Sequence, residues 1–435
     1  MKETVLGLIP LDWDIVKAKD FCDFVTDGTH DTPIPKEEGH YLVTSKNLKN
    51  DGLDFENCYF ISKEDFVSIN RRSGVSQYDL LYGMIGTIGN PTIIYQSEID
   101  FAVKNVGLFK MGGDLQKSIW LYNFLNSHFY SNYISRMQSG TSQQFVGLGF
   151  LRKIPVLIPK TSDNNIDWHR LSKINYSLST VDKTIQATKN SIAKLEKLKT
   201  SLMQNLLTGK MKPDGTWRKE DEFWIDDKFG KVPNGWKISY LKDVQDINRE
   251  SLPASTDPNY ILKYITIEAV FTDRIDFNKV PVYKFSEAPG RARRIIKKGD
   301  FIVSTVRPNL KGFARLQEEG DNWICSTGFA TVSPIEKQVS DFYFFQILSF
   351  IGEKQFASFI SGSNYPAVTD RDFKQLKVYE APFEEQIEIA SKIESVVAII
   401  NKKQASINQL DKLKKSLMQN LLTGKVRIPQ EALNQ

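Results

Sequence analysis

Apolar residues recur at alternating steps of three and four along two long stretches, residues 171–206 and 389–421. This spacing predicts two long amphipathic helices whose apolar stripes pack as the seam of a coiled coil. We expect the first helix to run from about residue 168 to residue 207. The seam positions are Leu178, Val181, Ile185, Ile192, Leu195 and Leu202 in the first helix and Ile393, Val396, Ile400, Ile407, Leu410 and Leu417 in the second.

The two predicted helices end in nearly the same sequence. Residues 195–210 read LEKLKTSLMQNLLTGK and residues 410–425 read LDKLKKSLMQNLLTGK, with 14 of 16 positions identical. Gly209 and Gly424 can take the left-handed conformation in which helices commonly end. The two helices could pair antiparallel and relate the halves of the chain by a pseudo-two-fold axis. The alternative is two bundle helices that share an ancestor and never touch.

The duplication extends beyond the helices. Pro10 and Trp13 near the start correspond to Pro233 and Trp236, residues 77–90 resemble 297–309, and residues 139–146 resemble 361–368. The predicted fold is α+β, with two mixed α/β domains and two long antiparallel helices. The expected boundaries are a first globular domain at 1–160, a helical spacer at 161–210, a linker and second globular domain at 211–382, and a second helical spacer at 383–435.

Short strands and one helix are expected in the first globular domain. The strands should cover residues 55–61, 79–89, 107–111 and 153–159, and an amphipathic helix should cover residues 119–137. Trp13, Trp120, Trp236 and Trp323 are expected to be core or domain-junction residues rather than stacking partners for bases.

The composition is that of a soluble globular protein, with 41% hydrophobic and 25% charged residues among 435. Cys22, Cys58 and Cys325 are odd in number and scattered, which indicates a reducing cytosol and argues against a cysteine metal site. The first residues lack the pattern of a signal peptide, and the longest apolar run is too short for a membrane span. A cytoplasmic protein is expected. The net charge of +5 is compatible with a polyanionic partner.

Motifs for catalysis are not found in the sequence. Lys210 and Lys425 follow Gly but lack the rest of a phosphate-binding loop, and Asn90-Pro91 is followed by Thr92 rather than by the second proline of an amino-methyltransferase motif. The four histidines also show no zinc-ligand spacing. We therefore expect no metal and no catalytic site in this chain.

Over nearly its full length the chain resembles the specificity subunits of type I restriction-modification systems. The residues that carry the resemblance are the two SLMQNLLTGK helix ends, the P-x-x-W start of each half, and DGTHDTP, YLVTSKNLKN and MIGTIGNP in the first domain. The resemblance implies two target recognition domains, which read a bipartite, asymmetric target on double-stranded DNA, and two conserved helical spacers.

It also implies that the chain is not an enzyme and binds no cofactor. It would direct two methyltransferase subunits, which use S-adenosylmethionine to methylate adenine N6, and restriction subunits, which use ATP and Mg. The competing hypothesis is a coiled-coil DNA-binding or architectural protein without a methyltransferase partner.

Polar loops supply the candidate residues for DNA binding, because base edges are read by amide, hydroxyl and cationic side chains. In the first domain they are Thr29, His30, Asp31, Thr32, Ser45, Lys46, Asn47, Ser139, Thr141, Ser142, Gln143 and Gln144. In the second domain they are Asn248, Arg249, Arg291, Arg293, Arg294, Thr305, Arg307, Asn309, Lys311, Ser363, Asn364 and Tyr365.

Plainer explanations exist for these loops: a simple Asp-Gly turn at residues 27–33, a solvated loop at 139–144 and a solvated face at the arginine run. Two positions differ between the halves as specificity determinants should, since Arg307 and Asn309 align with Gly86 and Ile88. Gln143 and Gln144 are the best candidates for paired hydrogen bonds to an adenine edge. Phe145 or Tyr365 could fill the place of an adenine flipped out for methylation.

Overall fold

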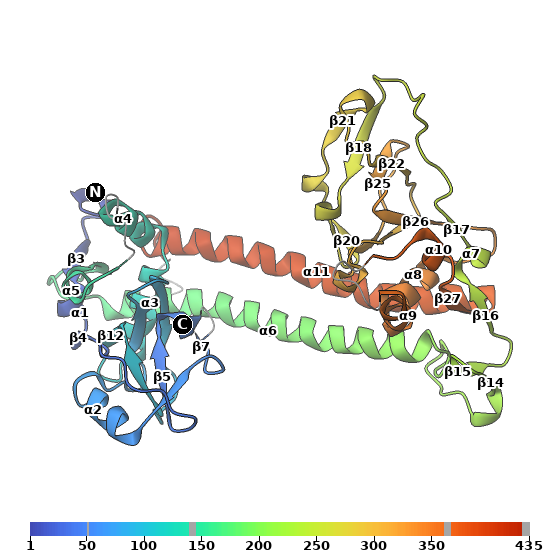
Figure 1. Ribbon diagram of the computed structural model, residues 1–435. Helices are drawn as coiled ribbons and strands as arrows, with labels where there is room; N and C mark the ends of the chain where they lie inside the picture. The colour runs from blue at the N-terminus through green and yellow to red at the C-terminus, as the bar shows by residue number, and fades with distance from the viewer. Residues whose placement is uncertain (50–51, 139–144, 361–366, 429–435) are drawn as a thin grey trace. The chain divides into compact units, whose positions relative to one another are not determined.

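A computed structural model describes residues 1–49, 52–138, 145–360 and 367–428 (Figure 1). The chain forms two compact units. The first unit consists of Met1–Lys189 and Ala405–Gln435, and the second unit consists of Asn190–Gln404. Each long helix therefore contributes residues to both units. Among the described residues, no helix combines the length and the apolar character needed to cross a bilayer.

The first unit is built on a four-stranded antiparallel sheet in the order β10-β9-β12-β4 and a three-stranded sheet in the order β11-β5-β8. Its strands are β1 (Lys2–Thr4), β2 (Gly7–Ile9), β3 (Trp13–Lys17), β4 (Phe24–Asp27), β5 (His40–Thr44), β6 (Leu48–Lys49), β7 (Gly52–Leu53), β8 (Tyr59–Ile61), β9 (Leu80–Gly83), β10 (Gly89–Ile93), β11 (Phe101–Lys104), β12 (Val106–Lys110) and β13 (Pro155–Pro159). Its helices before the long one are α1 (Ala18–Phe21), η1 (Ser45–Asn47), α2 (Lys63–Ser73), α3 (Leu115–Leu125), α4 (His128–Gln138) and α5 (Leu148–Lys153).

The second unit contains four-stranded sheets in the orders β17-β26-β23-β24 and β21-β18-β25-β22. Its strands are β14 (Phe223–Asp226), β15 (Gly230–Pro233), β16 (Lys237–Tyr240), β17 (Gln245–Ile247), β18 (Ile261–Ile265), β19 (Val270–Phe271), β20 (Arg274–Ile275), β21 (Val282–Lys284), β22 (Ala292–Ile295), β23 (Phe301–Ser304), β24 (Phe313–Arg315), β25 (Trp323–Ser326), β26 (Phe329–Pro334) and β27 (Lys377–Glu380). Its shorter helices are η2 (Glu220–Glu222), α7 (Leu241–Val244), η3 (Ile267–Ala269), η4 (Phe277–Lys279), η5 (Phe285–Glu287), η6 (Pro308–Leu310), α8 (Ser340–Leu348), α9 (Phe350–Ile360) and α10 (Asp370–Phe373).

The two units repeat the same strand connections. The order β10-β9-β12-β4 in the first unit matches β24-β23-β26-β17 in the second. The parallel pair β5–β11 has its counterpart in the parallel pair β18–β25, and β3–β13 has its counterpart in β16–β27. The duplication predicted from the sequence is confirmed by these repeated pairings.

Several local predictions were wrong in extent. The helix expected at 119–137 is two helices, α3 and α4, because the chain breaks at Asn126 and Ser127, where Ser127 Oγ accepts a hydrogen bond from Tyr130 N (3.3 Å). The strand expected at 55–61 is limited to Tyr59–Ile61. Residues 79–89 hold one strand and the first residue of the next, which pair as a hairpin.

The two long helices are α6 (Trp168–Leu206) and α11 (Phe383–Leu421), so the extent predicted for the first of them is confirmed. In the first unit the start of α6, including Leu171 and Leu178, shares the core with Met418 and Leu421 near the end of α11. In that unit Lys414 Nζ also lies 2.6 Å from Asp182 Oδ1.

In the second unit Met203 and Leu206, near the end of α6, share the core with Ile389 and Ile393, near the start of α11. Every predicted seam residue is at least half-buried. The fully buried ones are Leu178, Val181, Ile185, Ile393, Val396, Ile400 and Ile407, and the half-buried ones are Ile192, Leu195, Leu202, Leu410 and Leu417.

Each helix ends against the P-x-x-W segment of its unit. Gly209 (φ +65°) and Gly424 (φ +66°) are both left-handed. A Cβ atom at Gly424 would collide with the Trp13 ring, and one at Gly209 would collide with Pro233. The shared glycine is therefore required by its backbone conformation and by the close contact. The four tryptophans predicted to be core residues are all buried, at 0–6% exposure.

Candidate nucleic-acid interface

In the first unit the segment 27–32 leaves the end of β4 and is held on the sheet. Gly28 lies against the backbone of Val103, where a side chain would collide. His30 forms hydrogen bonds through Nδ1 with Asn105 Oδ1 (2.8 Å) and through Nε2 with Asp27 Oδ2 (3.1 Å). His30 is exposed, as are Asp31 and Thr32, whereas Thr29 is half-buried. These contacts hold the candidate segment against the sheet.

The candidates Ser45 and Asn47 are buried in the same unit, and Ser45 also bonds with Asn105. Ser45 Oγ donates to Asn105 O (3.0 Å) and accepts from Met84 N (3.1 Å). Asn47 Oδ1 accepts from Thr44 N (2.9 Å) and so caps the η1 turn. These two side chains hold the loop together and do not face solvent. Lys46, between them, is exposed and is the member of this group that can reach a phosphate.

The third candidate group of the first unit, Ser139, Thr141, Ser142, Gln143 and Gln144, lies outside the described residues. Its place is bounded by Val146, whose N donates to Met84 O (2.9 Å), and by Phe145, which bridges to Ile85. Phe145 and Val146 therefore lie beside the turn at residues 84–88. Phe145 is half exposed, at 52%.

In the second unit the corresponding turn, residues 305–311, carries four of the predicted residues, Thr305, Arg307, Asn309 and Lys311. Arg307 immediately precedes η6 and Asn309 lies within it; both are exposed, and Lys311 pairs with Glu353. Arg307 and Lys311 are left-handed, with φ of +50° at each.

The matching positions Gly86 (φ +70°) and Asn90 (φ +46°) are left-handed too, so these two left-handed positions recur in both units, whereas Gly89 (φ +100°) corresponds to Leu310, which does not have positive φ. Thr305 O accepts from Val368 N (2.8 Å), the same connection as that of Met84 with Val146. The candidates Ser363, Asn364 and Tyr365 lie outside the described residues.

The remaining cationic candidates differ in their exposure and in their interaction partners. Arg294 Nη2 and Asn248 Nδ2 both donate to the carboxylate of Asp370, each at 3.2 Å. The guanidinium of Arg293 stacks over the ring of Phe285 at 4.6 Å. Arg294 therefore belongs to an internal network more than to the surface.

Arg249 and Arg291 are the exposed members of this group. Arg249 forms an ion pair with Asp246 (3.2 Å) and donates through Nη2 to Pro334 O (3.2 Å). Next to it, the hydrogen bond from Lys297 holds the pKa of Glu250 below its usual value, so Glu250 stays ionised. The carboxylate partners limit how much positive charge this edge presents.

Two residues that the sequence reasoning missed organise these edges. Asn105, left-handed at φ +53°, links segment 27–32 to Ser45, and Asp370 links Asn248 to Arg294. The sequence signal for Asn105 was slight: an asparagine between two apolar strands, at a position that favours positive φ. Nothing local in the sequence distinguishes Asp370.

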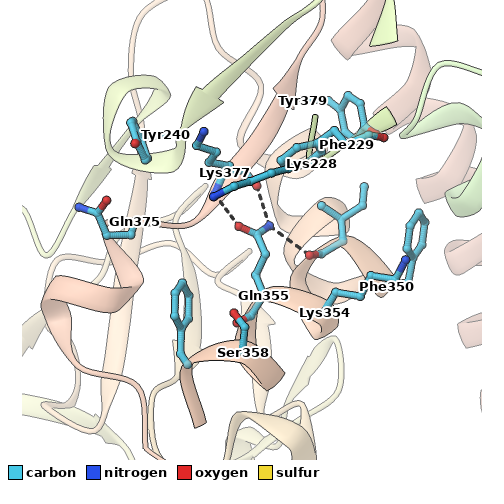
Figure 2. A pocket seen from close by; sticks show the side chains of 12 residues that line it. Lys228, Phe229, Tyr240, Phe350, Lys354, Gln355, Ser358, Gln375, Lys377 and Tyr379 are labelled. Carbon is cyan, nitrogen blue, oxygen red and sulfur yellow. Dashed lines mark hydrogen bonds between the residues drawn. The ribbon is translucent and has the colours of Figure 1, made fainter. Parts of the chain in front are cut away.

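A separate hollow of about 370 Å³ in the second unit is lined by lysines and aromatic rings (Figure 2). Lys377 Nζ lies 5.3 Å from the Tyr240 ring centroid, and Lys354 Nζ lies 5.5 Å from that of Phe350. Gln355 is fixed at its side by hydrogen bonds of 2.8 Å with both Lys377 N and Lys377 O. With Lys228 also present, the hollow can accept an anionic group such as a phosphate.

Each half of the chain matches the same family model. The family model described as the type I restriction modification DNA specificity domain matches residues 10–197 and again residues 233–411. The chain belongs to this family. The two matches together span most of the chain, and each covers the globular domain of one half and most of the long helix that follows it.

Relatives within the type I specificity family align along nearly the whole chain. The specificity subunit of the type I restriction enzyme MjaVIII of Methanocaldococcus jannaschii is 22% identical over 432 residues, covering 97% of this chain and 94% of the relative. The putative MjaX specificity subunit of the same organism is also 22% identical, over 452 residues, covering 98% and 96%. The crystal structure of the type I S subunit from M. genitalium has the same fold, with a TM-score of 0.55, 12% identity and coverage of 97% of this chain and 98% of that one.

Proposed function

We propose that this chain selects the DNA sequence at which partner subunits of a type I restriction-modification complex act, and that it catalyses no reaction itself. The observation that carries the proposal is the turn repeated at residues 84–90 and 305–311. Two of its left-handed backbone positions recur in both units, yet Gly86 and Ile88 are replaced by exposed Arg307 and Asn309. Two domains that recognise different half-sites need a shared backbone that carries different side chains.

We further propose that residues 1–160 and 211–382 are two target recognition domains and that residues 161–210 and 383–435 are spacers. The long helices would form an antiparallel coiled coil that relates the halves by a pseudo-two-fold axis. In support, the start of α6 packs with the end of α11 in one unit, and the end of α6 packs with the start of α11 in the other. Readers held in this way would contact two half-sites about 34–36 Å apart, and the target would be bipartite and asymmetric.

The partners follow from the near identity of the helix ends. Two equal surfaces suit two copies of one partner, which we propose to be methyltransferase subunits that use S-adenosylmethionine. Restriction subunits, which use ATP and Mg, would join the full complex, and the chain itself would bind no cofactor. We propose that such a complex acts on DNA in the cytoplasm.

Of the candidate residues, we assign base reading to Arg307 and Asn309 and phosphate contacts to Lys46, Arg249 and Arg291, because these five side chains are exposed. The others would position the loops that bind DNA; they include Arg294, which is half-buried, and His30, which is exposed but bound through both ring nitrogens to Asn105 and Asp27. The same assignment predicts that the segments 139–144 and 361–366 read bases, since Val146 and Val368, which follow them in the chain, donate hydrogen bonds to the repeated turn of their unit.

The test replaces Arg307 and Asn309 with the residues found at the matching positions of the first unit. The double variant Arg307→Gly, Asn309→Ile keeps the backbone pattern, because glycine occupies the matching left-handed position. We expect methylation to relax or change at one half of the target while the other half is kept. The control Arg249→Ala removes a phosphate contact and should lower methylation evenly at all sites. An unchanged motif, or a change in both halves, would refute the assignment.

A further inference from the structure

In the first unit a hollow of about 610 Å³ lies between segment 29–36 and helix α2. We call it the α2 hollow. One wall is the loop that follows β4 and includes the candidates Asp31 and Thr32, and the other wall is the face of α2 that carries Ile69 and Arg72. A candidate DNA-binding loop thus shares a hollow with an arginine that is not among the sequence candidates.

Arg72 is held at one end and open at the other. Its Nη2 donates to Asp27 Oδ1 at 2.6 Å, and the Asp27 side chain is 4% exposed. The Arg72 side chain is 63% exposed, and its Nε and Nη1 donate to no residue in the described part of the chain. Asp27 also bonds with Nε2 of His30 (3.1 Å), so one carboxylate anchors both the candidate loop and the guanidinium. The unused N–H groups of Arg72 remain available to a ligand.

An arginine that is anchored in this way is suited to recognition. A buried carboxylate is costly without its partner, so Asp27 keeps the guanidinium in place. The anchored planar fork loses less conformational entropy on binding than an unrestrained side chain does. Arg71 provides the contrast, because it is exposed on the same helix but makes no ion pair with any residue that the structure describes.

The charges of the α2 hollow favour a base edge over a phosphate. Its lining includes the carboxylates of Asp31, Glu64 and Asp65 as well as the cations Lys36 and Arg72. A hydrogen bond from its own backbone N–H holds the pKa of Glu64 below its usual value, so this carboxylate is ionised at neutral pH. A phosphate would meet three negative charges here. The major-groove edge of guanine is neutral and offers two acceptors, O6 and N7, and the amino group of its cytosine partner is a donor that carboxylates accept.

Arg72 also belongs to an element that the duplication does not share. The parallel pairs β5–β11 and β18–β25 correspond. In the first unit β11 is the end strand of its sheet and α2 packs against it, with Asn70 Nδ2 donating to Phe101 O (3.5 Å). In the second unit the strand β22 pairs with β25 instead. Two domains that recognise different half-sites are expected to differ at such an element.

We propose that Arg72 is a base-reading residue of the first unit and that it donates hydrogen bonds to O6 and N7 of a guanine in the half-site of this unit. This inference rests on the proposed function, since it presupposes that the chain selects a DNA sequence. Asp27 is then a positioning residue, which holds the guanidinium beside the candidate loop. The target should contain a G·C pair in the half that the variant Arg307→Gly, Asn309→Ile leaves unchanged.

The test maps N6-methyladenine in a methylation-free host that expresses the full chain with a type I methyltransferase subunit. With the wild-type chain, methylation should favour G·C over A·T at one position of that half by about tenfold or more. Arg72→Lys keeps a positive charge beside Asp27 but lacks the planar fork, so this preference should fall to within about threefold while the other half is kept. Arg71→Lys is the matched control and should leave the preference intact.

A second variant guards against loss of folding, which urea denaturation detects. If Arg72→Lys is less stable than the wild type, the double variant Asp27→Asn, Arg72→Gln leaves no charge buried alone, and it should fold and lose the same preference.

The outcomes separate this inference from the proposed function. A wild-type motif without a G·C pair in that half, a motif unchanged in both Arg72 variants, or a preference equally weakened by Arg71→Lys would overturn the inference alone. An even loss of methylation at all sites would identify a phosphate contact and would overturn it too. Methylation that does not depend on the wild-type chain would refute the proposed function itself.

Discussion

Replacing Arg315 with methionine should destabilise the second unit strongly, because it leaves a buried carboxylate without its partner. Arg315 and Asp273 are 9% and 8% exposed at their side chains, and Arg315 Nη2 lies 2.9 Å from Asp273 Oδ1. The same guanidinium reaches Asp341 on α8 and Glu394 on α11. It therefore ties strand β24 to α8 and to the long helix α11 within this unit.

The size of this destabilisation follows from the burial of the Arg315–Asp273 pair. At 2.9 Å and an effective dielectric constant of about 20, the Arg315–Asp273 attraction is about 6 kcal/mol before desolvation is subtracted. Breaking a buried pair by removing one partner typically costs about 3–5 kcal/mol. The pairs with Asp341 and Glu394 add little, since these carboxylates are 41% and 44% exposed. We expect a loss of about 3–5 kcal/mol.

The loss should depend on pH in a defined direction. Burial raises the pKa of Asp273 above its usual value although Arg315 lowers it, and removing Arg315 raises it further. A carboxyl whose pKa is raised by folding favours the folded state at low pH, and this stability is lost as the pH rises through the folded pKa. The deficit of Arg315→Met relative to the wild type should thus be larger at pH 8 than at pH 5.

Urea denaturation, followed by circular dichroism at both pH values, measures the deficit. Arg249→Met is the matched control, because its ion pair is on the surface, and it should cost less than about 1 kcal/mol. The double variant Arg315→Met, Asp273→Asn should recover much of the stability, since no charge is then buried alone. A deficit below about 1 kcal/mol, or one that grows as the pH falls, would refute this reasoning.

Three further predictions concern the first unit. Gly424→Ala should lower the free energy of unfolding by more than about 1 kcal/mol, since Gly424 is left-handed and touches Trp13, whereas Gly149→Ala, in open space on helix α5, should not destabilise; urea denaturation compares them. Trp120→Phe should cost about 1–3 kcal/mol in the same assay, because the Leu157 carbonyl loses the indole N–H at 2.9 Å, and a cost near zero would contradict that bond. Asn105→Gly keeps the backbone conformation but releases His30, so DNA affinity measured by fluorescence anisotropy should fall while the salt dependence of binding is unchanged; unaltered affinity would argue against a positioning role.

Features with a repeated sequence signal could be predicted before the structure. The three-four spacing gave the extent of α6 and the buried seam, and the P-x-x-W segments marked where each helix end docks. The alignment of Arg307 with Gly86 is supported by the left-handed backbone at both positions. These features depend on short-range periodicity or on comparison within the chain.

Features that depend on contacts between distant residues could not be predicted. The break between α3 and α4 arises from a local hydrogen bond of Ser127 inside an otherwise continuous apolar pattern. Ser45 and Asn47 resemble surface residues in sequence but are buried, where Ser45 bonds with the backbone of Asn105 and Met84 and Asn47 bonds with the backbone of Thr44 and Asp54. Within the described residues, the carboxylate partners of Arg315 come from positions 26, 42 and 79 residues away, a pairing that no local pattern signals.

The central claim is that this chain directs methylation to a split DNA sequence. Single-molecule sequencing for N6-methyladenine tests it most directly, in a methylation-free host that expresses a type I methyltransferase subunit with or without this chain. The account predicts methylation at one bipartite, asymmetric motif when both are present and none at that motif with the methyltransferase alone. Methylation that is absent with both proteins, or the same without this chain, would contradict it.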